Sequence, residues 1–220
     1  MRPLVILGSG GYAQEILWIV DDLDREKTEW EFLGFVDPGH PERKGASLYD
    51  RPILGGFEDL TTVPRNTWFA CGIGTPAARR KECDKADELG WNPATLVHPS
   101  VIMAKHVEVG AGTVVGAGSI LAPYARLGRH CAVNLQVTVG HNSEVGDYTV
   151  LSPGARISGH VVVEDQVMIG TNATIYVGRR VGAGASLGAN SFLVTDLPAG
   201  KSAIGIPASH LGPSSREQER

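Results

Sequence analysis

The stretch VTVGHNSEVGDYTVLSPGARISG, residues 137–159, carries a pattern that returns every six residues. An aliphatic residue stands at four positions six apart, each followed by glycine or serine: Val139, Val145, Leu151 and Ile157. A helix repeats every 3.6 residues and a strand every two, so neither explains this spacing. A triangular coil with three six-residue sides does, because each short strand then pairs with the coils before and after it.

The same spacing extends far beyond this stretch. All seventeen positions from Val97 to Leu193 in steps of six hold Val, Leu, Ile or Met. The position four residues after them is small or apolar in nearly every repeat, with Arg179 as an exception, and Cys131 occupies one such position. We therefore expect a parallel β-helix of hexapeptide repeats over residues 93–212, with the aliphatic side chains inside. Cys131 is expected to pack in the interior rather than to act as a nucleophile.

The first ninety-odd residues follow another rule. LVILGSGG, residues 4–11, is an apolar run that ends in glycines, and helical spacing of apolar residues follows it up to Leu23. A second apolar run ends at Asp37, a third ends near Gly72, and a helix is expected over 76–89. This alternation predicts an α/β domain over 1–92 with a small parallel sheet, about half of a Rossmann-like fold. Residues 213–220 are expected to be a flexible tail.

The glycine turn suggests a ligand. Gly10 and Gly11 can bring backbone N–H groups close to a phosphate at a helix N-terminus, and Asp37 can accept a hydrogen bond from a hydroxyl. The plain alternative is a glycine turn that only packs the strand against the helix. Because this domain is too short for a full dinucleotide fold, a nucleotide or nucleotide-sugar is favoured over NAD.

Composition excludes several classes of function. The net charge is −4, which gives no electrostatic footprint for nucleic acid or for an anionic membrane. The N-terminal apolar run is too short for a signal peptide or a membrane span. Three widely spaced cysteines indicate neither a disulfide framework nor a cysteine-only zinc site. We therefore expect a cytoplasmic protein.

The chain resembles the sugar O- and N-acyltransferases of the hexapeptide-repeat superfamily, over nearly its whole length. The branch it resembles acetylates amino groups of nucleotide-linked sugars of the bacillosamine and perosamine type, and includes relatives of the sialic acid O-acetyltransferases. The resemblance is carried by five motifs: LGSGGYAQEI from Leu7, GFVDP from Gly34, LVHPSV from Leu96, HNSEVGDYTVLSPGARISG from His141 and IGIPA from Ile204. It implies a left-handed β-helix, a homotrimer, and acetyl-CoA bound between neighbouring β-helices without any metal.

The resemblance also assigns residues. It implies that the N-terminal domain holds the nucleotide-linked amino sugar, at Gly10, Gly11, Tyr12, Asp37, Pro38 and Gly74. It implies that acetyl-CoA contacts Gly159, Thr171, Ala189, Gly205 and Pro207, with the N–H of Gly159 facing the thioester carbonyl oxygen. The catalytic positions are His141 and the residue after it, Asn142.

His141 fits this chemistry on its own properties. It follows the glycine after Val139, where a side chain can face outward from the coil. Asn134, Gln136, Asn142 and Ser143 are expected to form a polar cluster around it. A sugar amine must lose a proton as it attacks a thioester, and imidazole accepts protons near neutral pH. The plain reading is an exposed surface histidine.

Four positions depart from the family pattern. The residue after the catalytic histidine is usually acidic, whereas Asn142 cannot stabilise an imidazolium by charge. The ring would then depend on Glu144, on a neighbouring subunit or on a backbone carbonyl. A second histidine of some relatives is replaced by Val150, and basic residues after Pro-Ala are replaced by Ser209 and His210. Arg179 and Arg180 could supply charge for phosphates, or could simply be a solvated pair.

Other functions remain open on the sequence. Acetylation of a sugar hydroxyl, as on a sialic acid, would use the same histidine. A non-catalytic trimeric scaffold that binds sugar-nucleotides is a second alternative. A carbonic-anhydrase-type zinc site would need a further histidine five residues after His141, and Gly146 stands there.

Overall fold

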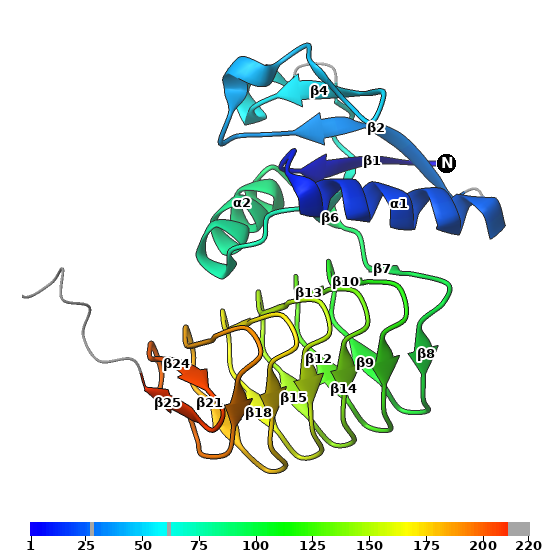
Figure 1. Ribbon diagram of the computed structural model, residues 1–220. Coiled ribbons are helices and arrows are strands. Elements are labelled where there is room, and N and C mark those ends of the chain that lie inside the picture. Colours follow the sequence, from blue (N-terminus) through cyan, green and yellow to red (C-terminus); the bar gives the residue numbers. More distant parts are fainter. Residues whose placement is uncertain (27–28, 61–62, 211–220) are drawn as a thin grey trace, which may run out of the picture.

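The computed structural model describes residues 1–26, 29–60 and 63–210, so the predicted tail at 213–220 lies outside it. A small α/β domain lies along one face of a long stack of parallel coils (Figure 1). Both predicted architectures are confirmed, and the stack is a left-handed parallel β-helix. Neither helix in the described part is long and apolar enough to cross a bilayer.

The N-terminal sheet has the strand order β3-β4-β2-β1-β5-β6, and only the β3–β4 pair is antiparallel. Its strands are β1 (Arg2–Leu7), β2 (Trp30–Val36), β3 (Ser47–Leu48), β4 (Arg51–Gly55), β5 (Trp68–Cys71) and β6 (Asn92–Pro93). Its helices are α1 (Gly11–Glu26), α2 (Pro76–Glu88) and two 3-10 turns, η1 (Pro41–Arg43) and η2 (Phe57–Asp59). The three long strands and both α-helices match the prediction, whereas β3, β4 and β6 were not predicted.

The central strand β1 is buried on both sides. Leu4 and Ile6 belong to the apolar cluster that contains α1, while Val5 and Leu7 belong to the cluster that contains α2. Alternate side chains of a strand point to opposite faces, so a continuous apolar run is what a sheet covered by helices on both faces requires. This packing brings the carboxyl ends of β1, β2 and β5 to one edge, where the glycine turn lies.

The β-helix has three faces, each a parallel sheet except that β25 runs antiparallel to β24 at the end of the first. The domain-facing sheet contains β7 (Leu96–Val97), β10 (Val114–Val115), β13 (Ala132–Val133), β16 (Val150–Leu151), β19 (Met168–Ile169), β22 (Ser186–Leu187), β24 (Ser202–Gly205) and β25 (Ala208–His210). The second sheet contains β8 (Ile102–Met103), β11 (Ile120–Leu121), β14 (Thr138–Val139), β17 (Arg156–Ile157), β20 (Thr174–Ile175) and β23 (Phe192–Leu193). The third sheet contains β9 (Glu108–Val109), β12 (Arg126–Leu127), β15 (Glu144–Val145), β18 (Val162–Val163) and β21 (Arg180–Val181).

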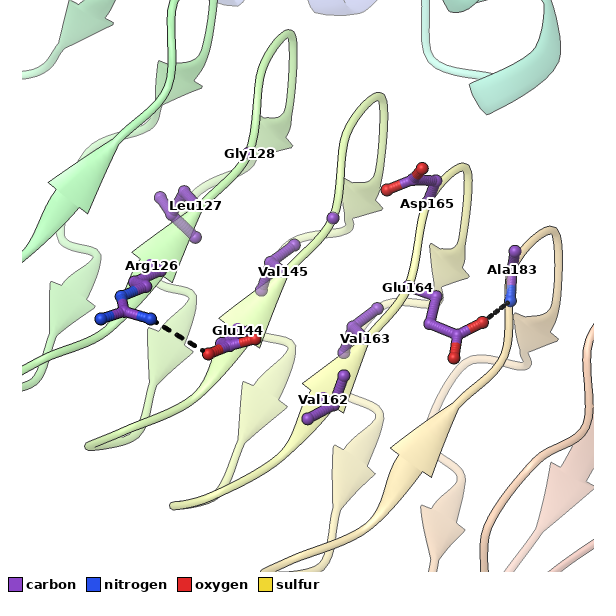
Figure 2. Close-up of a pocket in the computed structure, with 11 residues that line it drawn as sticks. Arg126, Leu127, Gly128, Glu144, Val145, Val162, Val163, Glu164, Asp165 and Ala183 are labelled. Atoms are coloured by element: carbon purple, nitrogen blue, oxygen red, sulfur yellow. Dashed lines mark hydrogen bonds and ion pairs between the residues drawn. The ribbon is translucent and has the colours of Figure 1, made fainter.

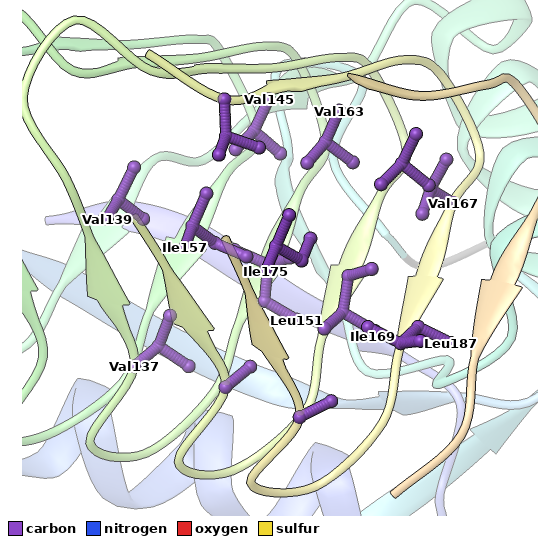
Figure 3. Packing of buried hydrophobic residues seen from close by; sticks show 14 of the residues in the cluster. Val137, Val139, Val145, Leu151, Ile157, Val163, Val167, Ile169, Ile175 and Leu187 are labelled. Atoms are coloured by element: carbon purple, nitrogen blue, oxygen red, sulfur yellow. The ribbon is translucent and has the colours of Figure 1, made fainter. Parts of the chain in front are cut away.

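Pairing between coils is in register at eighteen residues, as in Val139 opposite Ile157 and Ile157 opposite Ile175. The predicted aliphatic column fills the interior of the stack from Val115 to Leu193 (Figure 3). Met103, in the first coil, is an exception and is 49% exposed. Buried hydroxyls join successive coils: Ser143 Oγ donates to Ser158 O at 2.7 Å and accepts from Val161 N at 3.1 Å. Each coil therefore holds its neighbour through backbone ladders, apolar contacts and internal hydroxyl bridges.

Cys131 occupies one of these interior positions. It is fully buried, and its Sγ donates to Gly146 O at 3.1 Å. Burial raises the pKa of the Cys131 thiol to about 11. A thiol that stays protonated at neutral pH is a poor nucleophile, so its packing role agrees with the expectation.

Glycines that directly follow the aliphatic residues, such as Gly140, are needed for close packing of the coils and do not form the corners. Gly140 does not form the corner: a Cβ there would lie 2.5 Å from the carbonyl carbon of Ser158 in the next coil. The left-handed backbone that makes the corner falls two residues later, at Asn142 with φ of 58°. Glycine is needed in this column because successive coils approach closely, and asparagine tolerates the corner because its side chain is compatible with positive φ.

The two domains are packed together. Ala94, Leu96 and Val114 of the β-helix side belong to the same apolar cluster as α1. Tyr148 Oη donates to Asp84 Oδ1 of α2 at 2.7 Å, and His98 Nε2 lies 3.0 Å from Asp22 Oδ2 of α1. The N-terminal domain is thus fixed over the domain-facing sheet.

Candidate functional site

His141 lies on the corner between β14 and β15, and its side chain is exposed. This corner joins the second and third sheets, so it is the edge of the triangular prism opposite the domain-facing sheet. We call it the His141 corner; successive coils contribute residues 123–124, 141–142, 159–160 and 177–178 to it. The expected outward orientation of His141 is correct.

Asn142 supplies the partner that the sequence left open. Its Oδ1 lies 3.1 Å from Nδ1 of His141. A carboxamide oxygen can only accept, so the contact selects the tautomer with hydrogen on Nδ1 and leaves Nε2 with a free lone pair. Glu144 is instead used by Arg126, whose Nη1 donates to Glu144 Oε1 at 3.3 Å.

Gly159 lies in the next coil beneath the His141 ring. A Cβ built on Gly159 would come within 2.6 Å of Nε2 and 2.7 Å of Cε1 of His141. The ring edge that carries the free lone pair therefore occupies the space that a side chain at 159 would fill. The ring of His160 meets that of His141 edge to face, with centroids 4.9 Å apart.

Backbone N–H groups at the corners separate into two kinds. At the corner between the third and the domain-facing sheets, carboxylates cap them: Asp147 Oδ1 accepts from Arg129 N at 2.7 Å, and Asp165 Oδ1 from Asp147 N at 2.9 Å. Glu164 Oε2 accepts from Ala183 N at 2.9 Å in the same way (Figure 2). A pocket of about 460 Å³ lies on this third face, but its carboxylates already serve the protein's own donors.

Three backbone N–H groups at the corners on either side of the second sheet have no such cap among the described residues. Within the described part of the chain, no residue accepts a hydrogen bond from the N–H of Gly159, Thr171 or Ala189. Gly159 lies on the His141 corner, while Thr171 and Ala189 lie in successive coils on the corner after β19 and β22. Three of the five residues expected to contact acetyl-CoA thus present free donors along the edges of one face.

The other expected acetyl-CoA contacts lie at the far end of the stack. Gly205 and Pro207 flank the turn between β24 and β25, and Gly205 N donates to Ser191 Oγ at 3.0 Å. Arg180 pairs with Glu164 at 2.6 Å, and Arg179 lies 3.9 Å from Asp196. Both arginines therefore have acidic partners, which favours the solvated-pair interpretation.

The glycines of the N-terminal domain also divide into two groups. Gly72 is required by packing, because a Cβ there would lie 2.7 Å from Ala13 Cβ, and Gly8 has φ of 86°. Gly10, Gly11 and Gly74 would have no heavy atom within 4 Å of an added Cβ. Packing therefore does not require glycine at the three predicted positions, which leaves bare backbone facing open space at the start of α1 and after β5.

Asp37 follows β2 directly and is 6% exposed. Its Oδ2 accepts from the hydroxyl of Ser9 in the glycine turn and lies 3.8 Å from Arg43 Nη1. Arg43 Nη1 also donates to Ser9 Oγ at 2.5 Å. Asp37 thus ties the end of β2 to the glycine turn, and its Oδ1 lies 3.4 Å from His40 Nδ1. Ser9, His40 and Arg43 were missed because no motif marks them.

Tyr12 and Gly74 face the β-helix across a pocket of about 140 Å³. Ala132, Asn134, Val150, Ser152 and Met168 of the domain-facing sheet complete its lining. Tyr12 Oη is buried without a hydrogen-bond partner among the described residues, and burial raises the pKa of the Tyr12 phenol well above its usual value. Val150 lines this pocket with an apolar side chain. Pro38 lies elsewhere, in a pocket of about 390 Å³ beside Phe57 and α2.

The predicted polar cluster around His141 is wrong in three of its members. Ser143 is fully buried inside the coil, where its hydroxyl bridges two backbone groups. Asn134 lines the pocket beside Tyr12 on the opposite face, and Gln136 lies on the corner between β13 and β14. Of the four, Asn142 is hydrogen-bonded to the His141 ring. The coil turns by a third of a circle every six residues, so residues six or more positions apart within one coil lie on different faces. Adjacent residues can also differ, because one points into the coil and the next points out.

One chain does not bring the two halves of the site together. Tyr12 and Gly74 lie over the domain-facing sheet, whereas His141 lies at the corner opposite to it. No group of three or more His, Cys, Asp or Glu side chains that could hold a metal occurs among residues 1–26, 29–60 and 63–210.

Comparison with known proteins supports both domains. The family model described as PglD N-terminal domain matches residues 3–86. No curated protein sequence matches the chain. The acetyltransferase domain of PglB from Neisseria gonorrhoeae is similar in structure, with a TM-score of 0.86 and 26% identity over 96% of this chain and 100% of that chain. It has also been solved in complex with acetyl coenzyme A, with a TM-score of 0.85.

A perosamine N-acetyltransferase from Caulobacter crescentus, in a variant with one histidine replaced by asparagine, was solved with CoA and GDP-perosamine. It superposes with a TM-score of 0.87 at 26% identity, covering 97% of this chain and 98% of that one. WeeI from Acinetobacter baumannii, at 23% identity and a TM-score of 0.88, supports the fold alone. The chain is therefore similar in structure to sugar N-acetyltransferases of the hexapeptide-repeat type, and residues 3–86 match the PglD N-terminal domain model.

Proposed function

We propose that the protein transfers the acetyl group of acetyl-CoA to the amino group of a nucleotide-linked 4-amino-deoxysugar, with a UDP- or GDP-sugar as the acceptor. The observation that carries the proposal is His141, whose Nδ1 is held by Asn142 while Nε2 lies over Gly159. Support also comes from the similar structures, which were solved with acetyl coenzyme A or with CoA and GDP-perosamine.

His141 acts as the general base in this proposal. The amine nitrogen attacks the thioester carbonyl carbon, and Nε2 takes the proton that the nitrogen loses as the C–N bond forms. The C–S bond then breaks, and the imidazolium returns the proton to the CoA thiolate. A positioned base contributes about 10²–10⁴-fold to such a reaction. No acyl-enzyme is needed, which agrees with the burial of Cys131.

Gly159 has two roles in the proposal. Its missing side chain makes room for the His141 ring, and its free N–H donates to the thioester carbonyl oxygen as negative charge develops there. The free N–H groups of Thr171 and Ala189 are suited to the amide carbonyls of the pantetheine arm. Gly205 and Pro207 would then lie near the adenine end.

The acceptor is held by the other domain. Gly10 and Gly11 open the first turn of α1, whose N–H groups and dipole favour the diphosphate. Asp37 would accept a hydrogen bond from a ribose or sugar hydroxyl through Oδ1, and Tyr12 and Gly74 line the pocket against the β-helix. Pro38 follows Asp37 and lines the separate pocket beside Phe57.

The separation of the two halves requires a neighbouring chain. In a homotrimer, the His141 corner of one chain would face the domain-facing sheet and glycine turn of the next. Large apolar side chains are exposed around this corner and on the second sheet: Ile120 41%, Tyr124 53%, Tyr176 51% and Val177 41%. Contiguous exposed apolar residues mark surfaces that other chains cover, which supports an interface here.

Three free, buried cysteines fit a reducing cytoplasm, where acetyl-CoA is available.

Acetylation of a sugar hydroxyl is the second candidate, because the same base and donors would serve an oxygen nucleophile. A sugar-nucleotide-binding scaffold without catalysis is the third, and the orientation of His141 by Asn142 argues against it.

The test is acetyl-CoA consumption, followed by release of the free thiol, with UDP-, GDP- and dTDP-linked amino sugars and with sialic acid as acceptors. The proposal expects turnover with an amino sugar and an amide in the product by mass spectrometry. Turnover only with sialic acid would select O-acetylation. No turnover with any acceptor, from protein that binds acetyl-CoA, would contradict the enzymatic proposal.

A further inference from the structure

Arg79 is the largest fully buried side chain of the protein, and the proposed chemistry does not use it. It lies in the first turn of α2, four residues after Thr75, whose carbonyl accepts its backbone N–H at 2.8 Å. Among the described residues no carboxylate pairs with its guanidinium. Burying a charge without a counter-ion costs desolvation free energy, and the hydrogen bonds of the guanidinium must offset this cost.

The guanidinium donates to four backbone carbonyls, two from each domain. On the N-terminal side, Nη1 donates to Cys71 O at 2.9 Å and to Ile73 O at 3.0 Å. On the β-helix side, Nε donates to His130 O at 2.5 Å and Nη2 to Cys131 O at 3.2 Å. Four hydrogen bonds from a rigid, planar group fix the relative position of both backbones.

Two of these carbonyls, those of Ile73 and Cys131, belong to residues that directly precede lining residues of one pocket. Ile73 immediately precedes Gly74, and Cys131 immediately precedes Ala132 of β13. Gly74 and Ala132 face each other across the 140 Å³ pocket that Tyr12 and Asn134 also line. The Arg79 guanidinium carbon lies 5.9 Å from the centre of the Tyr12 ring, so the same side chain supports a third part of the wall.

We propose that Arg79 is a positioning residue that sets the width of this pocket, by holding the Gly72–Gly74 loop at a fixed distance from β13. The inference rests on the proposed function only in naming the ligand, a nucleotide-linked sugar whose sugar end lies in the pocket. Arg79 itself does not touch the ligand. Its effect is on acceptor binding, and acetyl-CoA binding on the second sheet is unaffected.

A matched control exists at the same domain interface. Tyr148 Oη donates to Asp84 Oδ1, and the Tyr148 ring stacks on His130 at 5.3 Å, but neither contact involves the Gly72–Gly74 loop. Tyr148→Phe removes one interdomain hydrogen bond and keeps the ring. It therefore reports the cost of weakening the interface without moving the pocket wall.

The experiment compares Arg79→Lys, Arg79→Met and Tyr148→Phe for steady-state kinetics and amide hydrogen exchange. We expect Arg79→Lys to raise KM for the sugar-nucleotide at least tenfold with KM for acetyl-CoA within twofold of wild type. Tyr148→Phe should lower Tm and leave both KM values within twofold. Amides of residues 72–75 should exchange faster in Arg79→Lys and at the wild-type rate in Tyr148→Phe.

Hydrogen exchange distinguishes failure of the proposed function from failure of the proposed role of Arg79. If the wild type has no activity on any sugar-nucleotide, the proposed function fails, while faster exchange of residues 72–75 in Arg79→Lys alone still supports the positioning role. If Arg79→Met does not fold, Arg79→Lys decides, since it keeps the charge and part of the hydrogen bonding. A folded Arg79→Lys with unchanged KM for the acceptor and unchanged exchange in this loop overturns the proposal.

Discussion

Nδ1 of His141 lies 3.1 Å from Oδ1 of Asn142, so the histidine is oriented by a neutral carboxamide rather than by a carboxylate. An amide oxygen fixes the tautomer but supplies no negative charge to stabilise the imidazolium. Asn142 also makes the corner with φ of 58°, a conformation that asparagine tolerates better than most residues. One residue therefore serves both the coil and the proposed base.

Replacing His141 by alanine or asparagine should lower kcat by about two to four orders of magnitude, because the base is lost. The side chain is exposed, so the fold should be unaffected. The measurement is kcat for acetyl transfer together with circular dichroism and Tm. A loss of less than tenfold in a folded variant would remove His141 from the base role.

Asn142 can be tested by two substitutions. The hydrogen bond to Nδ1 predicts that Asn142→Ala lowers kcat about tenfold, which corresponds to roughly 1.4 kcal/mol. Asn142→Asp should keep activity and move the acidic limb of the kcat–pH profile to higher pH, because a carboxylate stabilises the imidazolium. An unchanged pH profile in Asn142→Asp would show that residue 142 does not act on the base.

Gly159→Ala tests the space beneath the ring. The added Cβ would lie 2.6 Å from Nε2, so the His141 ring must move away from its position. We expect kcat to fall by about ten- to a hundredfold, since small misplacements of a catalytic group are costly, while Tm stays close to wild type. Gly178→Ala, on the same corner with nothing near its Cβ but with φ of 71°, is the control for backbone strain alone.

The glycines of the N-terminal domain give a paired prediction. Gly10→Ala has room for its Cβ, so it should leave Tm unchanged and raise KM for the sugar-nucleotide by obstructing the backbone N–H groups. Gly72→Ala should lower Tm, because its Cβ would lie 2.7 Å from Ala13 Cβ and 2.9 Å from Leu7 O. If Gly10→Ala leaves KM for the acceptor unchanged, the turn serves only packing.

His130 predicts a pH dependence of stability. Its ring is fully buried between Phe69 and Tyr148, and burial lowers its pKa from 6.5 to about 4, although Asp87 lies 3.7 Å from Nε2. Asp84, Arg79 and Arg129 also face this ring, and the two arginines oppose its protonation. The unfolded chain therefore binds a proton between pH 6.5 and 4 that the folded chain does not.

Stability from this group is present above pH 6.5 and is lost as pH falls toward 4, by at most about 3 kcal/mol. Urea unfolding at several pH values measures this. His130→Asn keeps a residue that tolerates φ of 52° and removes the titration, so its stability should fall less steeply over this range. An equal slope in both proteins would assign the pH dependence to other groups.

The β-helix could be predicted from the sequence because every sixth residue from Val97 to Leu193 is aliphatic, a spacing that neither a helix nor a flat sheet explains. The long strands and helices of the first domain follow from apolar runs and helical spacing. The hairpin β3–β4 could not be predicted, since its turn residues Tyr49 and Asp50 adopt positive φ without glycine or asparagine. Strand β6 spans only Asn92–Pro93, and its pairing with β5 is decided by tertiary packing.

The candidate site was predictable where a residue's exposure follows from the period, as at His141. It was not predictable where long-range packing decides. Arg79 joins segments more than fifty residues apart, and no local pattern marks it as buried. Ser143 has the polarity of a site residue, but its place in the coil turns the hydroxyl inward.

In the proposed trimer, His141 of one chain acts on an acceptor held by the glycine turn of another. Co-expression of two inactive variants, His141→Ala and Gly10→Asp, followed by an activity assay of the mixed oligomers, measures this sharing. A shared site predicts recovery of about a quarter of wild-type activity, because random trimers pair an intact His141 with an intact turn in that fraction of sites. No recovery in mixed oligomers, with each variant folded and trimeric, would contradict the account.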